Sequence, residues 1–147
     1  MKVYKRKAQF YETDQMGIIH HASYINWLEE ARVDFMDQMG YGYRKTTELG
    51  VDIALLGLGC EYKSMVRFGD TVDITASITA ISPTRMTVSY AITDAEIGTL
   101  RSTAETRHCF FSNARQRPVA LSREQPELYE LLVRYSSPAA FGTRPSM

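Results

Sequence analysis

One long amphipathic helix pattern, between Ser23 and Met39, sets the strongest limit on how this chain can fold. Apolar residues recur along it at spacings of three and four: Tyr24, Trp27, Leu28, Ala31, Phe35 and Met39. A stripe this broad is stable only when it is buried against another element. We expect Ser23 to be the N-cap of this helix, and Gly40 and Gly42 to end it.

Two neighbouring carboxylates on this helix have different surroundings. Glu30 falls on the polar edge, so we expect it to be solvated. Glu29 has Ile25 and Val33 one turn away on either side, and residues four apart are neighbours on a helix surface. Its carboxylate therefore borders a second apolar strip, either at a partner surface or at a pocket wall.

The other regular patterns predict strands. Alternating apolar and polar residues indicate strands at 71–80, 86–92 and 100–111, with a looser first strand at 3–11. Residues 51–62 are apolar on both parities, which is typical of a strand covered on both sides. Short connections between the later strands favour an antiparallel meander. A helix of about 16 residues is about 24 Å long, so we expect an α+β fold in which about five strands curl around it.

The length of 147 residues suits a single domain, which we place at residues 1–135. Ser122 and Gln125 form a capping-box pattern before a short helix that ends near Val133. Ser, Pro, Gly and Ala dominate residues 136–147, which predicts a flexible C-terminal tail.

Composition excludes several classes of function. Lys and Arg together number 17, and so do Asp and Glu. The chain therefore lacks the net positive charge that is typical of nucleic-acid-binding proteins. The longest apolar run, residues 53–60, is far shorter than the ~20 residues of a membrane span, and no apolar region follows the basic N-terminus as in a signal peptide. The two cysteines lack CxxC spacing, which indicates free thiols and a cytoplasmic location.

No motif in the sequence calls for a metal or a cofactor. The adjacent residues His20 and His21 cannot readily chelate one ion, and the spacings of zinc sites are absent. GxSxG, P-loop and GxGxxG motifs are also absent, which argues against serine hydrolases, nucleotide hydrolases and dinucleotide-dependent enzymes.

The most distinctive segment spans the end of the first strand, a turn and the start of the helix. It reads Tyr11-Glu12-Thr13-Asp14-Gln15-Met16-Gly17-Ile18-Ile19-His20-His21-Ala22-Ser23-Tyr24 and continues to Glu29-Glu30-Ala31-Arg32. This segment resembles the signature of the 4-hydroxybenzoyl-CoA thioesterase family, in the variety that includes bacterial acyl-CoA thioesterases encoded near the Tol-Pal system. Further matches are Arg67-Phe68-Gly69-Asp70 and Arg117-Pro118. The resemblance implies a hot-dog fold and a homodimer or homotetramer with active sites between subunits.

The resemblance also implies roles for individual residues. Asp14 matches the catalytic aspartate, as nucleophile or as the base that activates water, although Asp in a turn also has a purely structural use. Gly17 matches the glycine that lets the turn pass close to the substrate, and the N–H of His21 falls where the family polarises the thioester carbonyl.

Glu29 is a further catalytic candidate, and a carboxylate pair of Glu12 with Asp14 stays open. Candidates for substrate contact are Tyr24, Ile25, Trp27 and Arg67.

The chemistry of a thioester fits this small set of groups. A thiol has a pKa near ~8.5, so a thiolate leaves without a strong general acid. One carboxylate and one donor for the carbonyl oxygen then suffice. We therefore expect an acyl-CoA thioesterase that needs no cofactor. The alternative is a non-catalytic hot-dog protein that binds acyl-CoA or acyl carrier protein, and a hot-dog dehydratase fits the Asp14 segment poorly.

Overall fold

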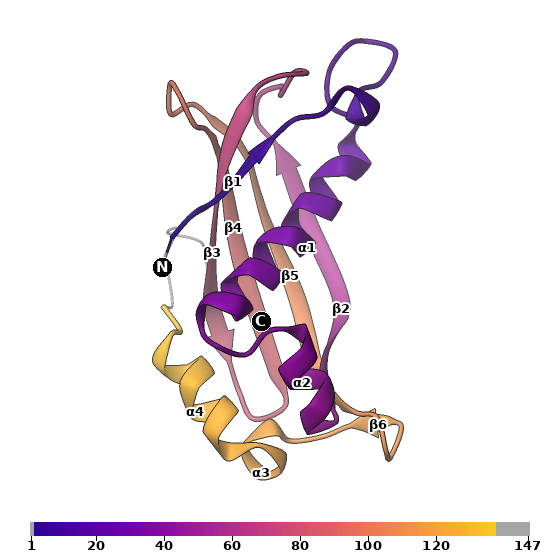
Figure 1. The fold of residues 1–147 in the computed structure, drawn as a ribbon, viewed down its shortest axis with the longest axis vertical. Helices are drawn as coiled ribbons and strands as arrows, with labels where there is room; N and C mark the ends of the chain where they lie inside the picture. Colours follow the sequence, from indigo (N-terminus) through magenta and orange to yellow (C-terminus); the bar gives the residue numbers. More distant parts are fainter. Residues whose placement is uncertain (1, 138–147) are drawn as a thin grey trace.

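The computed structural model describes residues 2–137, in which an antiparallel sheet curls around one long helix (Figure 1). The strand order is β1-β3-β4-β5-β2, and β6 pairs with β5. Every pairing between these strands is antiparallel. The expected α+β hot-dog arrangement is confirmed. The strands are β1 (Tyr4–Lys7), β2 (Val51–Tyr62), β3 (Thr71–Ile81), β4 (Arg85–Asp94), β5 (Leu100–Ser112) and β6 (Arg117–Pro118).

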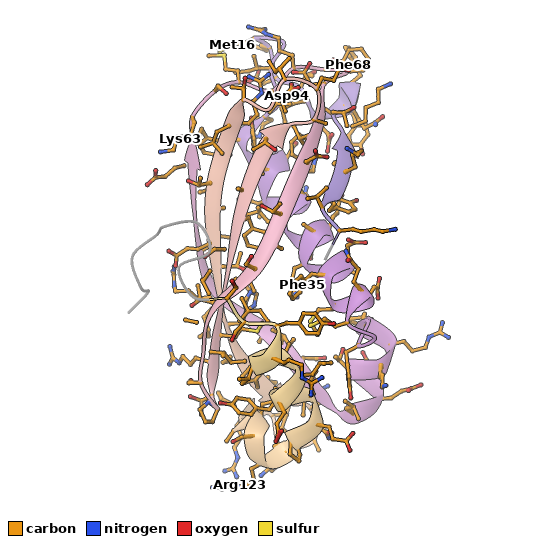
Figure 2. The ribbon with its side chains drawn as sticks, turned by 90° about the vertical axis from the view of Figure 1, so that its left-hand side faces the viewer. Met16, Phe35, Lys63, Phe68, Asp94 and Arg123 are labelled. Atoms are coloured by element: carbon orange, nitrogen blue, oxygen red, sulfur yellow. The ribbon has the colours of Figure 1, made fainter. Side chains whose placement is uncertain are left out.

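The long helix α1 (His21–Gln38) lies across the concave face of the sheet, and shorter helices gather near its C-terminal end (Figure 1). These are α2 (Tyr43–Leu49), α3 (Leu121–Glu124) and α4 (Pro126–Arg134). A single 3-10 turn, η1 (Phe10–Glu12), precedes α1. The opposite end of the molecule, where α1 begins, contains the loops around η1 and the turn that holds Asp94 (Figure 2).

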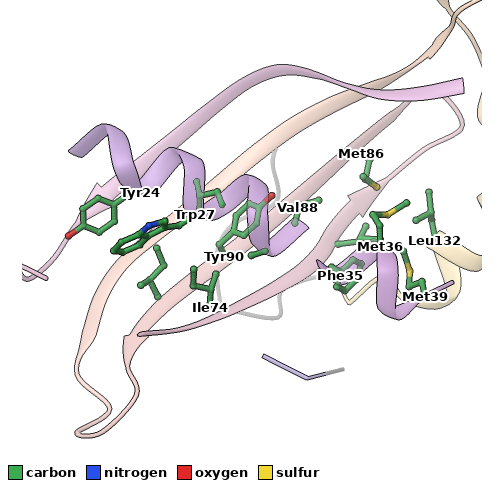
Figure 3. Packing of buried hydrophobic residues seen from close by; sticks show 14 of the residues in the cluster. Tyr24, Trp27, Phe35, Met36, Met39, Ile74, Met86, Val88, Tyr90 and Leu132 are labelled. Atoms are coloured by element: carbon green, nitrogen blue, oxygen red, sulfur yellow. The ribbon is translucent and has the colours of Figure 1, made fainter. Parts of the chain in front are cut away.

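The predicted apolar stripe of α1 forms the centre of the core. Trp27 and Leu28 are 0% and 1% exposed, and they pack in one cluster with Ile74 and Tyr90 of the sheet (Figure 3). Burial of each such side chain contributes on the order of 1.5–3 kcal/mol. The helix thus holds the sheet in its curled shape.

Two expected elements are different in the structure. The first strand ends at Lys7 because Lys7 pairs with Thr71, the first residue of β3, and no strand continues beyond it. The capping box of Ser122 with Gln125 is wrong, since α3 begins at Leu121 without a side-chain cap. Pro126 then starts α4, where its missing N–H costs no hydrogen bond.

The two ends of the sheet order are β1 and β2. β2 has 12 residues and leaves Leu55 and Leu56 half exposed beside a register shift against β5. Of the expected tail, residues 138–147 lie outside the described residues, while the N–H of Ser137 donates to the carbonyl of Ile78 at 2.7 Å. Each helix among residues 2–137 is too short or too polar to cross a bilayer.

Candidate active site at the start of the long helix

Asp14 begins a tight turn in a short hairpin that leads into α1. Its N–H donates to the carbonyl of Ile18 at 2.9 Å, and its carbonyl accepts the N–H of Gly17 at 3.1 Å. Gly17 has a φ of +77°, the left-handed conformation that follows a tight turn in a three-residue hairpin loop. A Cβ at Gly17 would meet nothing within 4 Å. The glycine is therefore required by backbone conformation, not by lack of space within this chain.

The carboxylate of Asp14 has one occupied and one open oxygen. Oδ1 accepts the N–H of Met16 at 2.8 Å, which is the local bond expected of an Asp in a turn. Oδ2 accepts no hydrogen bond from residues 2–137, and the side chain is half-buried. Asp14 therefore does have the structural role of a turn residue. Its second carboxylate oxygen is still available as a base or nucleophile.

The two arms of the hairpin are fixed close to the turn. Thr13 bridges Ile19, and Ile18 bridges Arg67 on the neighbouring segment. Ile19 is 3% exposed, and its N–H donates to the carbonyl of Val66 at 2.8 Å. Figure 2 shows Met16, near the tip of the hairpin, at the opposite end of the molecule from Arg123 of α3. The returning arm, to which the backbone of Asp14 is hydrogen-bonded, is therefore anchored to the segment around Val66 and Arg67.

α1 begins three residues earlier than expected, because its N-cap is His20 and not Ser23. The Nδ1 of His20 accepts the N–H of Ala22 at 3.1 Å, and its carbonyl accepts the N–H of Ser23 at 2.9 Å. The N–H of His21 has no acceptor within the described residues. The exposed side chain of His21 stacks on His20 with ring centroids 4.2 Å apart. The free N–H and the helix dipole make this terminus a site for developing negative charge.

Glu29 lies away from this terminus. It is eight residues after His21, which corresponds to ~12 Å along the helix. There it borders a cavity of about 390 Å³ between α1, α2, β2 and β5. The lining residues are Glu29, Arg32, Val33, Met36, Tyr41, Tyr43, Thr46, Asp52, Ile53, Ala54 and Phe111. One protomer therefore does not bring Glu29 together with Asp14.

The candidates for substrate contact fall into two groups. Tyr24 and Trp27 are 3% and 0% exposed and belong to the core. Ile25 is 38% exposed, and Arg67 is exposed with no side-chain partner among residues 2–137. The ring of Phe68, next to Arg67, meets that of Phe10 edge-on at 5.6 Å. Ile25 and Arg67 thus present side chains to the surface, whereas Tyr24 and Trp27 are buried beneath it.

Sequence reasoning missed the network beneath the hairpin. Glu12 is buried and accepts hydrogen bonds from Arg6 and from the indole of Trp27. Its carboxylate is therefore engaged and does not form a pair with Asp14. Glu30, expected to be solvated, accepts from Arg6 Nε at 2.8 Å and from the Tyr4 hydroxyl at 3.0 Å. A buried tryptophan needs an acceptor for its N–H. The burial expected for Trp27 was therefore the one signal in the sequence that a polar partner such as Glu12 lies nearby.

Comparison with known proteins identifies the superfamily of this chain. A family model described as the thioesterase-like superfamily matches residues 8–132. This chain belongs to the thioesterase-like superfamily. The acyl-CoA thioester hydrolase YbgC of Escherichia coli O6:H1 is 25% identical over 117 residues, which are 80% of this chain and 87% of that protein.

Solved structures extend the likeness within the superfamily. A hypothetical protein of Aquifex aeolicus has a TM-score of 0.80 and 33% identity, covering 88% of this chain and 98% of that one. The DHNA-CoA thioesterase of Staphylococcus aureus has a TM-score of 0.85 and 26% identity, covering 90% of this chain and 89% of that one. The similarity to these two structures thus covers about nine-tenths of this chain.

Proposed function

We propose that this protein is an acyl-CoA thioesterase, which hydrolyses a thioester to a free carboxylic acid and coenzyme A. One observation supports the proposal above others. The open Oδ2 of Asp14 lies in the hairpin that leads directly into α1, whose first N–H, that of His21, has no acceptor within the described residues. A carboxylate and a donor for the carbonyl oxygen are the two groups that this hydrolysis needs.

Two routes use these groups. As a base, Asp14 takes a proton from water, the hydroxide adds to the thioester carbon, and the C–S bond breaks to release the thiolate. As a nucleophile, the carboxylate itself adds to that carbon, the thiolate leaves, and water hydrolyses the resulting anhydride. In both routes the thiolate finally takes up a proton. The proposal leaves both routes open for Asp14.

The N–H of His21 stabilises the oxyanion that both routes form. The positive end of the α1 macrodipole points to the same place. Loss of one such donor in a well-studied hydrolase lowers the rate by ~10²-fold or more. Because the group is a backbone N–H, the identity of the side chain at this position is less important than the point at which the helix begins.

Substrate contacts form the finer part of the proposal. Arg67 is a cation for the coenzyme A phosphates, and Ile25 contacts the acyl group, with Tyr24 and Trp27 behind it. Glu29 contacts the far end of the acyl group or orients water from the partner subunit. The resemblance of the Asp14 segment to 4-hydroxybenzoyl-CoA thioesterases and their Tol-Pal-associated relatives supports an acyl-CoA substrate.

We also propose a homodimer, or a homotetramer built from such dimers, in which two copies of β2 meet. A long edge strand with exposed apolar side chains is normally covered, and Leu55 and Leu56 are 52% and 50% exposed in β2. The free thiols of Cys60 and Cys109 support a reducing cytoplasm as the location.

Release of free thiol from a panel of short, long and aromatic acyl-CoAs tests the function. The aromatic member is included because the Staphylococcus aureus relative is a DHNA-CoA thioesterase. Asp14→Asn is expected to lower kcat by ~10²-fold or more, since acid–base groups contribute ~10²–10⁴-fold. Asp73→Asn is the control, because Asp73 is another half-buried carboxylate, paired with Lys5 at 2.8 Å on β3.

The outcomes separate the alternatives. Turnover that is unchanged in Asp14→Asn rejects the assignment of Asp14. Acyl-CoA binding without thiol release across the whole panel supports the non-catalytic binding protein instead. Equal loss in the Asp14 and Asp73 variants points to a general effect on stability.

A further inference from the structure

The carboxylate of Glu12 is buried at the base of the Asp14 hairpin and joins three parts of the chain. It is 6% exposed and accepts four N–H groups. Arg6 of β1 donates from Nη1 at 3.2 Å and from Nη2 at 2.9 Å. The N–H of Gln9 and the Nε1–H of Trp27 in α1 each donate at 2.9 Å. Together these donors restrict the carboxylate to one position.

The backbone of Glu12 lies where the hairpin closes. Its carbonyl accepts the N–H of His20, the N-cap of α1, at 2.7 Å. The next residue, Thr13, bridges Ile19 across the hairpin, and Asp14 follows. A shift of Glu12 therefore moves the Asp14 carboxylate relative to the N–H of His21.

The outgoing arm of the hairpin pairs with the returning arm at Thr13 and Asp14, and its side-chain bonds to β1 and α1 are made by Glu12. Ile18 and Ile19, on the returning arm, are fixed by Arg67 and Val66. On the outgoing arm, the Thr13 hydroxyl donates only to the nearby carbonyl of Phe10, at 2.8 Å. The arm that contains Asp14 is thus held on one side by the returning arm and on the other through Glu12.

Stability alone does not account for this arrangement. Desolvation of a buried ion pair offsets most of its Coulomb attraction, so such pairs add little net stability. Arg6 also has a second partner in Glu30, at 2.8 Å, and does not depend on Glu12 for charge compensation. We propose that Glu12 is a positioning residue that sets the geometry of Asp14 against the start of α1. This inference rests on the proposed function, because it takes Asp14 as the reactive group.

Glu12→Gln tests the role with little change in side-chain volume. The amide places an NH₂ group among four donors, so the hairpin base must rearrange. We expect kcat to fall about 10- to 100-fold, because small misplacements of reacting groups have effects of that order. KM should stay within about threefold of the wild-type value, since no substrate contact is removed.

Glu30→Gln is the matched control. It removes the other carboxylate partner of Arg6 and leaves the four bonds to Glu12 intact. We expect its kcat to stay within about twofold of wild type, because Glu30 makes no bond to the hairpin.

A spectroscopic readout reports the bond itself. Trp27 is the only tryptophan in the chain, so the protein gives a single indole N–H resonance. That resonance should move upfield in Glu12→Gln, where a charged acceptor becomes neutral, and stay in place in Glu30→Gln. If Glu12→Gln does not fold, Trp27→Phe removes one donor while keeping the carboxylate, and it should lower kcat in the same direction.

Three results would overturn the inference. The first is a Glu12→Gln variant with kcat within twofold of wild type while the indole signal has moved. The second is an equal loss of kcat in the Glu12 and Glu30 variants, and the third is a Trp27→Phe variant with wild-type kcat. A wild type that turns over no acyl-CoA rejects the proposed function and this inference together. Loss of activity in Asp14→Asn but not in Glu12→Gln rejects the inference alone.

Discussion

The phenolic O–H of Tyr62 donates a hydrogen bond to the carbonyl of His21 at 3.1 Å. This bond joins the end of β2 to the first residue of α1, where the oxyanion donor is proposed. The Tyr62 ring also meets that of Tyr24 edge-on, with centroids 4.9 Å apart. Desolvation of the hydroxyl, with a contribution from Cys60, raises the pKa of Tyr62 to about 12. The phenol therefore remains a donor throughout the neutral and mildly alkaline range.

Tyr62→Phe should lower kcat a few-fold and the free energy of unfolding by about 0.5–1.5 kcal/mol, the net contribution of one hydrogen bond. Tyr135→Phe is the control, because Tyr135 is similarly exposed, at 40% against 48%, and packs edge-on against Phe35. Thiol release and urea unfolding measure the two effects. If both variants behave alike, the bond to His21 has no part in activity.

Gly17→Ala should reduce both stability and activity. An alanine in the left-handed conformation costs about 1–2 kcal/mol, and relief of that strain would distort the turn that begins at Asp14. Gly50→Ala is a matched control, since Gly50 has a φ of +78° and equally open surroundings but lies at the end of α2. Urea unfolding should show similar losses in both variants, and only Gly17→Ala should lose activity. If Gly17→Ala and Gly50→Ala had equal kcat values, the conformation of the turn would be unimportant for the reaction.

His108 should make the protein less stable in mild acid. It is fully buried, with Nε2 2.8 Å from the Thr106 hydroxyl. Burial and the nearby charge of Arg32 lower the pKa of His108 from 6.5 to about 4. The unfolded chain therefore binds a proton first, so the free energy of unfolding falls as the pH drops from above 6.5 towards 4. Between pH 7.5 and pH 5 this one group should contribute a loss of roughly 2 kcal/mol.

His108→Leu checks that assignment. The variant leaves Thr106 paired with Tyr90 at 2.8 Å. Its loss of unfolding free energy over the same pH interval should be smaller by roughly 2 kcal/mol, measured by urea denaturation at each pH. An unchanged pH dependence would assign the acid sensitivity to other groups.

Leu56→Lys should weaken the proposed dimer. A charged side chain on an edge strand opposes pairing with a second copy, so we expect at least about a tenfold rise in the dissociation constant by sedimentation equilibrium. Ile97→Lys provides the comparison, because Ile97 is 72% exposed in the turn between β4 and β5. A molar mass that is unaffected by Leu56→Lys at every concentration would argue against assembly through β2.

The fold was largely predictable from local patterns. The spacing of Trp27, Leu28 and Phe35 predicted a buried helix face, and all three are buried. Alternation predicted the meander of β3, β4 and β5, which pair in order. Both predictions depend only on the geometry of one element, and the sequence records that geometry directly.

The site was predictable only where bonds are local. The turn role of Asp14 depends on residues two to four positions away, so that role was visible in the sequence. The cap by His20, the burial of Glu12 and the pairing of Glu30 each depend on how the hairpin and β1 meet α1. The Trp27–Glu12 bond spans 15 positions. Such contacts are fixed by packing, and no periodicity encodes them.

In the hairpin, backbone groups hold Asp14 in place, whereas the side chains next to it face solvent. Gln15 and Met16 are exposed, and Met16 takes part in the turn through its backbone N–H rather than its side chain. Their side chains are therefore open to substitution while the carboxylate stays in place. A lineage with this turn could alter the surface beside the proposed reactive carboxylate one residue at a time, and so acquire new substrate preferences while the turn itself stays the same.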